Sequence, residues 1–316
     1  MSKDAKKKED ELPRISVEDL CKELETRGKR HNHGYYHYTL WKYFALMAEG
    51  KKTSDSVLER KFIRLSSSRC MNDVCDRKMQ EGTYIMSFSI GEEENVATWI
   101  MYGRDVKGYS CNGEDGLCGM KMDQAIRLKF RMKALNKWVR EVNDGKHKVY
   151  VRSDKEGMLQ LQQNSKIKAR LLDVAYIRSN NKKKNKVYAP CIKLGKDEYK
   201  ISDWPSCGQI NPIYAPFFKF KGWEYEREAR LVVEIGGIKS FPDYIFIPFE
   251  PIETLIAEAT SNTKDNDYCS PITMGPWFNK KANYEKIKGL DVYKNTGRSF
   301  YLDQIDLNTR NKVGNV

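Results

Sequence analysis

Apolar residues recur at two spacings along the chain, and the change of spacing divides it into elements. Alternating apolar and polar positions, or short aromatic runs, predict β-strands at residues 34–38, 61–67, 83–90, 217–221, 223–235 and 244–249. Apolar positions three and four residues apart predict helices at 15–30, 40–51 and 95–103. In the first helix, Ser16 is the expected N-cap and Gly28 the expected C-terminal end.

Short strands interspersed with short helices, without an internal repeat, predict an α+β fold with a mostly antiparallel split sheet. Residues 1–14 are dense in charge and poor in apolar residues, which predicts a disordered charged tail. Residues 15–316 are expected to form a single α+β domain. Residues 123–170 are basic and predicted to be a helical insertion, with an apolar stripe at Phe130, Leu135, Trp138 and Val142.

Lysine and arginine outnumber aspartate and glutamate by 56 to 43, a formal charge of +13. Such a charge attracts nucleic acid, nucleotides or anionic lipid, although a solvated lysine-rich surface would have the same composition. No apolar run is long enough to span a membrane and no secretory signal is visible, so a cytoplasmic protein without membrane contact is expected.

The eight cysteines are widely spaced, and we interpret them as reduced. Cys70 with Cys75, or Cys111 with Cys118, could ligate zinc only at a non-standard spacing. His31, His33 and His37 have the residue type of a metal site, but only His37 falls within a predicted strand. No metal is therefore expected, and His37 is either a structural strand residue or part of a site.

The segment WEYEREARLVVEI contains a row of carboxylates at every second position, Glu224, Glu226 and Glu228, continued by Arg230. If residues 223–235 form one strand, these side chains share a face. The face could be the solvated side of an antiparallel strand. It could also line a cleft, where Arg230 would keep a neighbouring carboxylate ionised.

Several motifs of common enzymes are absent, namely GxxxxGKS, GxGxxG after a strand, HExxH and GxSxG. The serines Ser87 and Ser89 alternate with Phe88, which by itself indicates only a polar strand face. Trp99 and Tyr102 lie three residues apart on a predicted helix, where they could pack in the core or clamp a ligand.

Taken in order, these segments resemble a bacterial family known as a domain of unknown function, DUF 2971. The matching segments are Tyr36-His37-Tyr38-Thr39, Asn72-Asp73, Ser87-Phe88-Ser89, Trp99 with Tyr102 before the glycine-rich GLCGM, and Trp223-Tyr225-Glu226-Glu228-Arg230. The resemblance covers most of residues 35–260, but this family implies no activity.

A second resemblance, to ADP-ribosyltransferases, does imply one. Their signature is an Arg or His on an early strand, a Ser, Thr or Tyr on a second strand, and a Glu, often in Glu-x-Glu, on a late strand. Here the matching residues are His37, Ser87 with Ser89, and Glu226-Arg227-Glu228. The resemblance implies NAD as the substrate, with Glu228 as the catalytic carboxylate and Glu226 acting on the acceptor.

By the same resemblance, NAD would be bound by a wider set of residues: His37, Tyr38, Thr39, Ser87, Ser89, Trp99, Tyr102 and Arg230. The chain is then expected to be an NAD-dependent ADP-ribosyltransferase-like enzyme, a defence or toxin-type effector that modifies nucleic acid or protein and is restrained by an inhibitory partner. The alternatives are a nucleic-acid-binding defence protein without NAD chemistry and an interaction module whose acidic strand face is only solvated.

Overall fold

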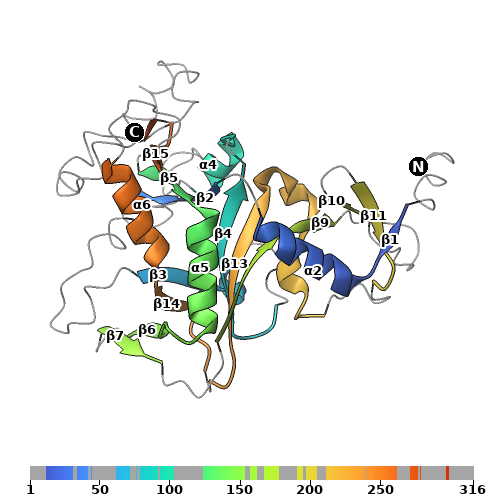
Figure 1. Cartoon of the computed structure of the whole chain (residues 1–316), viewed down its shortest axis with the longest axis horizontal. Coiled ribbons are helices and arrows are strands. Elements are labelled where there is room, and N and C mark those ends of the chain that lie inside the picture. Colours follow the sequence, from blue (N-terminus) through green and yellow to red (C-terminus); the bar gives the residue numbers. More distant parts are fainter. Residues whose placement is uncertain are drawn as a thin grey trace, which may run out of the picture. The chain divides into compact units, whose positions relative to one another are not determined.

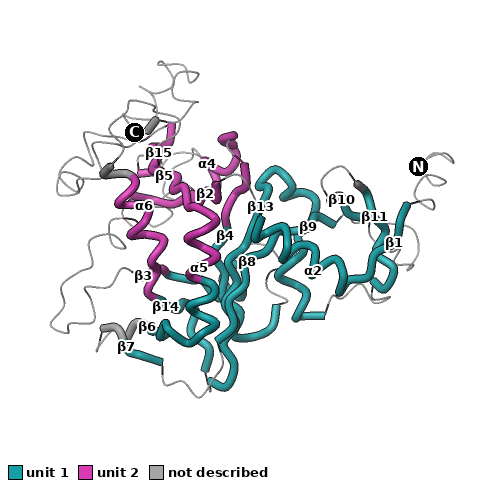
Figure 2. The backbone as a smooth tube through the Cα atoms, viewed as in Figure 1, with its two compact units in different colours: residues 1–32, 64–87, 139–247 teal, residues 33–63, 88–138, 248–316 magenta. Residues whose placement is uncertain are grey.

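In the computed structural model, the described residues are 12–30, 34–41, 44, 62–71, 76, 79–91, 93–102, 124–153, 157–161, 167–177, 191–194, 197–204, 211–238, 240–261, 271–276, 278 and 297–298. Within them the chain has an α+β fold whose sheets are mostly antiparallel (Figure 1). Two compact units are distinguished, each built from separate stretches of sequence (Figure 2). Unit 1 comprises residues 1–32, 64–87 and 139–247, and unit 2 comprises 33–63, 88–138 and 248–316.

The main ladder of unit 1 is formed by β13 (Glu228–Ile235) and β8 (Ile167–Asp173), which pair antiparallel along their whole length. Strand β13 also pairs with β4 (Thr83–Ile90), whose residues 83–87 belong to unit 1. Gly82 precedes β4 with φ of +83°, and an added Cβ would lie 2.3 Å from the carbonyl oxygen of Ile235. Glycine is therefore required where β4 starts beside the end of β13.

Helix α2 (Val17–Gly28) packs on β8 and begins as the sequence predicts. The Ser16 hydroxyl accepts a hydrogen bond from the backbone N–H of Asp19, which satisfies one of the free donors of the first turn. At its other end, a Cβ on Gly28 would meet the backbone of Leu172 at 2.6 Å, so the predicted terminal glycine permits close approach to β8. Val17, Leu20 and Leu24 enter the main apolar cluster of this unit.

The remaining elements of unit 1 are short strands and 3-10 helices. They are β1 (Arg14–Ile15), η2 (Ser68–Cys70), β6 (Tyr150–Ser153), β7 (Gly157–Gln160), β9 (Ala175–Ile177), β10 (Cys191–Leu194), β11 (Asp197–Ile201), η5 (Ala215–Phe217), β12 (Phe218–Phe220) and η6 (Lys221–Glu226). Strand β12 pairs parallel with β9, so that Lys219 lies opposite Tyr176. This pairing places both residues next to the start of β13.

Unit 2 is built around an antiparallel ladder between β2 (Tyr35–Leu40) and β5 (Ala125–Phe130). Strand β5 pairs on its other side with β15 (Ile272–Met274), which pairs with β16 (Gly297–Arg298). Helices α4 (Val96–Tyr102) and α6 (Glu250–Ser261) pack against β2 and β5 respectively. Strand β3 (Phe62–Ser67), strand β14 (Tyr244–Pro248) and helix α5 (Met132–Asn143) contribute residues to both units.

Most predicted elements are confirmed within one or two residues. The main differences lie in the range 123–170 and in residues 223–227, which precede β13. Among the described residues of the range 123–170, helix is confined to α5, and the other regular elements are strands β5, β6, β7 and the start of β8. Of the predicted apolar stripe, Leu135, Trp138 and Val142 are buried on the inward face of α5, whereas Phe130 is buried at the end of strand β5 and does not belong to the helix. Residues 1–11 of the predicted tail and most of the predicted helix at 40–51 lie outside the described residues, whereas Arg14, the last residue of the predicted tail, is ordered in β1 by pairing with β11.

Candidate functional site

The predicted strand over residues 223–235 is wrong in its first part. Residues 221–226 form the 3-10 helix η6, and Arg227 adopts a left-handed conformation with φ of 43° before β13 starts at Glu228. The row of carboxylates is therefore not one strand face: Glu224 is exposed, whereas Glu226 and Glu228 are each only 3% exposed. The solvated-face interpretation is thus wrong for Glu226, Glu228 and Arg230, which are all buried.

The Glu228 carboxylate accepts four hydrogen bonds from three side chains. Its Oε1 accepts from the Ser87 hydroxyl of β4 at 2.5 Å and from Arg230 Nε at 2.8 Å. Its Oε2 accepts from Lys219 Nζ at 2.9 Å and from Arg230 Nη2 at 3.2 Å. The backbone N–H of Glu228 donates to the Tyr176 hydroxyl oxygen at 2.7 Å, so both ends of the residue are held in place.

Arg230 is fully buried, and its guanidinium forms its contacts with other groups of the protein. Besides Glu228, its guanidinium contacts an Asp76 carboxylate oxygen at 2.8 Å and donates to the Pro216 carbonyl oxygen at 3.1 Å. The sequence allowed two roles for this residue, binding NAD or keeping a neighbouring carboxylate ionised. In the structure Arg230 supports the carboxylates, because its exposed fraction is 0%.

Lys219 joins the two glutamates. It lies in the middle of β12, is 4% exposed, and places Nζ at 2.5 Å from Glu226 Oε2 and 2.9 Å from Glu228 Oε2. The ammonium also lies 4.8 Å from the centre of the Trp223 ring, in a cation–π contact. We call the group of Asp76, Ser87, Lys219, Glu226, Glu228 and Arg230 the carboxylate cluster.

Opposite charges control ionisation in this cluster. Burial by itself raises the pKa of Glu228, but Arg230 and Lys219, with their hydrogen bonds, outweigh it and hold this pKa at about 2. Burial lowers and the neighbouring glutamates raise the pKa of Lys219, with a net rise. Burial and the charge of Glu228 raise the pKa of Tyr176, so its phenol stays neutral. Glu228 is thus a carboxylate and Lys219 an ammonium at neutral pH.

These charges determine what the cluster can do chemically. A carboxylate with a pKa near 2 is a poor proton acceptor at neutral pH, but it provides a fixed negative charge. Burying several ions carries a large desolvation cost, which is offset only where each ion is paired and hydrogen-bonded. Buried charge with a perturbed pKa is concentrated at functional sites, although structural ion-pair networks have the same signature. The cluster is accordingly the candidate site of unit 1.

His37 and Ser89 lie on different faces of the sheet in unit 2. In unit 2, β2 and β4 pair Tyr36 with Ser89, so Ser89 shares a face with Tyr36. His37 lies on the alternate face, where its ring packs edge-on against Phe88. The half-buried Thr39 shares the face of His37. His37 and Ser89 therefore point to opposite faces of the sheet within this unit.

Tyr38 and Trp99 pack together in the core of unit 2, where both are buried. Their rings meet edge-on at 4.7 Å, and the Trp99 indole N–H donates to Glu94 at 3.0 Å. Glu94 also forms a buried ion pair with Arg127, whose guanidinium lies over the Tyr36 ring. Of the two roles considered for Trp99, packing in the core and clamping a ligand, the structure shows packing in the core. Tyr102, at the end of α4, is 37% exposed.

Three residues of the site were not identified from sequence: Asp76, Tyr176 and Lys219. A lysine between phenylalanines in a strand was the available signal, because alternation there predicts that Lys219 is exposed and Phe220 buried. The structure has the reverse, with Phe220 43% exposed. Asp76 follows the Asn72-Asp73 motif, which itself lies outside the described residues, as do GLCGM, His31, His33, Cys75, Cys111 and Cys118.

In comparisons with known proteins, no family model matches the chain, and no curated protein or solved structure is significantly similar to it. Both family resemblances therefore stay predictions from the motifs. Within the described part of the chain, no group of three or more His, Cys, Asp or Glu residues could hold a metal ion. None of the described helices is long and apolar enough to cross a membrane.

Proposed function

We propose that this chain is an ADP-ribosyltransferase-like enzyme that cleaves the nicotinamide–ribose bond of NAD. The observation that carries the proposal is the hydrogen bond from Ser87 on β4 to Glu228 on β13. It brings together the second and third parts of the signature, which are far apart in the sequence. The proposal includes the finer fold, a split sheet of the ADP-ribosyltransferase type, and a role as a defence or toxin-type effector restrained by an inhibitory partner.

The chemistry follows from the charge of Glu228. When the bond between ribose C1′ and the nicotinamide nitrogen breaks, its electron pair leaves with nicotinamide and positive charge develops on the sugar. A preorganised carboxylate stabilises that charge. The acceptor then attacks C1′ as its proton passes to Glu226, which we assign to the acceptor side, and from there to water. Because Glu228 already accepts four hydrogen bonds, one donor must give way to the ribose.

The proposal assigns no role to His37, because it points away from the face that carries Ser89. Tyr36 and Tyr38 share the face of Ser89, but Tyr38 is buried in the aromatic core of unit 2 and is assigned no contact with NAD. Trp99 is assigned a structural role in supporting Tyr38. NAD is the substrate, and no metal takes part in the proposed reaction.

The test is nicotinamide release from NAD by purified wild-type protein and three variants, with and without RNA or DNA. Glu228→Gln is expected to abolish release, and Ser87→Ala to lower it at least about tenfold, the usual scale for an interaction that orients a catalytic group. Ser66→Ala is the matched control, since Ser66 is a half-buried strand serine of β3 in the same unit and has no part in the proposed site, and it should release nicotinamide like wild type. Circular dichroism and urea unfolding monitor the fold of each variant. No release by folded wild-type protein under any condition would overturn the proposal.

A nucleic-acid-binding function is the second candidate, and a specific surface favours it. The charge of +13 accompanies aromatic residues around η6: Phe220 is 43% and Tyr225 37% exposed, beside the half-buried Trp223. Exposed aromatic rings on a basic protein can stack on unpaired bases. This candidate predicts binding of single-stranded RNA or DNA that weakens steeply with salt, is reduced in Tyr225→Ser, and is unaffected in Glu228→Gln.

A further inference from the structure

The two glutamates of the carboxylate cluster come from different elements. Glu226 is the last residue of η6 and Glu228 the first of β13, with the left-handed Arg227 between them. Strand geometry therefore does not align their side chains. Two carboxylates brought together in a buried site repel each other, and one of them would take up a proton unless a cation lay between them.

Lys219 is the cation in that position. Arg230 contacts Glu228 and Asp76, whereas Lys219 contacts Glu226 and Glu228. The lysine is itself positioned by three features: the pairing of β12 with β9, the Trp223 ring, and the apolar neighbour Phe218, which is buried in the unit 1 core. A buried lysine on a strand is costly to maintain, which indicates that its charge is used.

We propose that Lys219 is a positioning residue that ties the end of η6 to the start of β13 and keeps Glu226 and Glu228 charged side by side. Its effect on catalysis rests on the proposed function, but its effect on the two carboxylates does not. The groups that face these carboxylates are Ser87 from β4, Tyr176 from β9, Lys219 from β12 and Arg230 from β13, with Asp76 behind Arg230.

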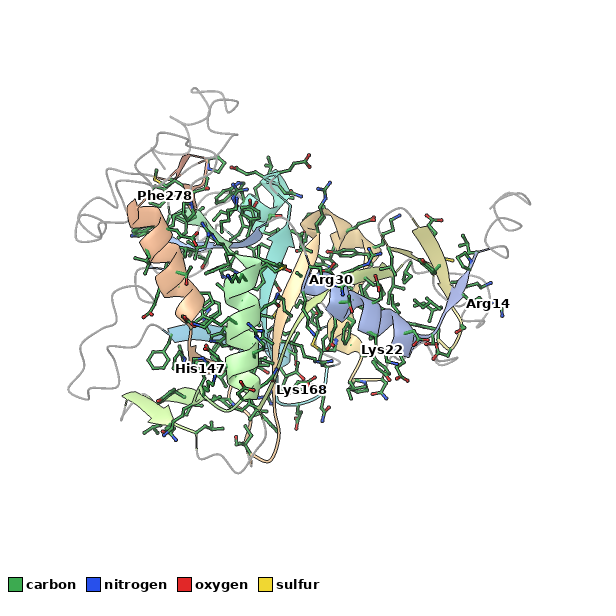
Figure 3. The ribbon with its side chains drawn as sticks, in the orientation of Figure 1. Arg14, Lys22, Arg30, His147, Lys168 and Phe278 are labelled. Atoms are coloured by element: carbon green, nitrogen blue, oxygen red, sulfur yellow. The ribbon has the colours of Figure 1, made fainter. Side chains whose placement is uncertain are left out.

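The first measurement does not depend on NAD chemistry. Urea unfolding is followed between pH 2 and pH 8 for wild type, Lys219→Arg, Lys219→Met and the double variant Lys219→Met/Glu226→Gln. The control is Lys168→Met, an exposed strand lysine of the same unit (Figure 3). Lys219→Met should raise the unfolding equilibrium constant at pH 7 on the order of 100-fold, because it leaves buried carboxylates without their counter-ion.

The pH dependence separates this role from simple packing. A carboxylate with a lowered pKa contributes stability that is complete above its unfolded pKa and is lost as the pH falls through its folded pKa. Lys219 lowers the folded pKa of Glu228, so the difference between wild type and Lys219→Met should shrink as the pH falls from about 5 toward about 2. Lys219→Arg should keep the wild-type pH dependence, and the double variant should recover at least tenfold of the lost stability at pH 7.

The second measurement is the pH profile of nicotinamide release. Lys219→Met should lower kcat more than it raises KM and shift the acid limb of the profile to higher pH, while Lys219→Arg restores the wild-type limb. A Lys219→Met defect in unfolding that stays constant from pH 8 to pH 2, or a double variant no more stable than the single one, would overturn the positioning role. If the unfolding results are as expected and no protein releases nicotinamide, the positioning role stands and the proposed NAD reaction is rejected.

Discussion

Each of the two units buries charged side chains, but in different ways. In unit 1, the carboxylate cluster contains five ionisable groups that share hydrogen bonds, with Glu228 at the centre. In unit 2, Arg127 and Glu94 form a single ion pair enclosed by the aromatic rings of Tyr36, Tyr38 and Trp99.

The difference indicates which charges are structural. A single buried pair surrounded by aromatic packing is satisfied by its own neighbours and adds to a core. A network with carboxylates from three separate segments needs several cations to remain charged, and such arrangements are concentrated at functional sites. The residues predicted from sequence as one site are accordingly divided: Ser87, Glu226, Glu228 and Arg230 belong to the cluster, while Tyr38 and Trp99 belong to the aromatic core of unit 2.

The largest expected effect is that of Arg230→Met. The substitution removes the partner of Glu228 and Asp76 and leaves their charges buried, so the free energy of unfolding should fall by about 5 kcal/mol. Urea unfolding at pH 7 measures this fall in free energy. The control is Arg30→Met, a substitution of an exposed arginine in unit 1 (Figure 3). A loss below about 1 kcal/mol would show that the cluster is not an interdependent network.

Acid should weaken the unit 1 cluster through Glu228. The pKa of this carboxyl is lowered from its ordinary 4.5 to about 2 in the folded chain. Its contribution of about 3 kcal/mol is therefore complete above pH 4.5 and disappears as the pH falls toward 2. The measurement is the difference in unfolding free energy between wild type and Glu228→Gln across this range. A difference independent of pH would contradict the charged state of Glu228.

A smaller loss of unfolding free energy is expected when the Arg127–Glu94 ion pair of unit 2 is broken. Arg127→Met removes a guanidinium 3.4 Å from the Glu94 carboxylate, yet the Trp99 indole N–H still donates to that carboxylate. The free energy of unfolding should fall by about 2 kcal/mol, less than for Arg230→Met. Urea unfolding of both variants in parallel tests the comparison, which fails if Arg127→Met costs as much as Arg230→Met.

The smallest expected effect concerns the left-handed residue between the two glutamates. An L-residue at the φ of Arg227 carries a cost of about 1 kcal/mol that glycine avoids. Arg227→Gly should therefore be more stable than Arg227→Ala by about that amount, in contrast to the usual order of these residues. Thermal and urea unfolding of the two variants provide the measurement. If Arg227→Ala is as stable as Arg227→Gly or more stable, the left-handed conformation carries no such cost.

Local sequence patterns were sufficient to predict the elements whose cause is local. Hydrophobic alternation located β4, β14 and most of β13, and an N-cap at Ser16 with a terminal Gly28 located α2. The row of charges at every second position also identified Glu226, Glu228 and Arg230 as candidates, and the resemblance to ADP-ribosyltransferases added Ser87.

Which of these side chains contact one another, and which carry a charge, depends on contacts between distant segments of the chain. Residues 221–226 form η6 and the left-handed Arg227 precedes β13, so period-two alternation could not show that Glu224 is exposed while Glu226 and Glu228 are buried. Lys219 and Phe220 exchange their expected environments because the Lys219 ammonium is neutralised by two glutamates from other elements, a long-range pairing that no local pattern contains. Charge burial depends on partners distant in the chain, and those partners are set by strand pairing.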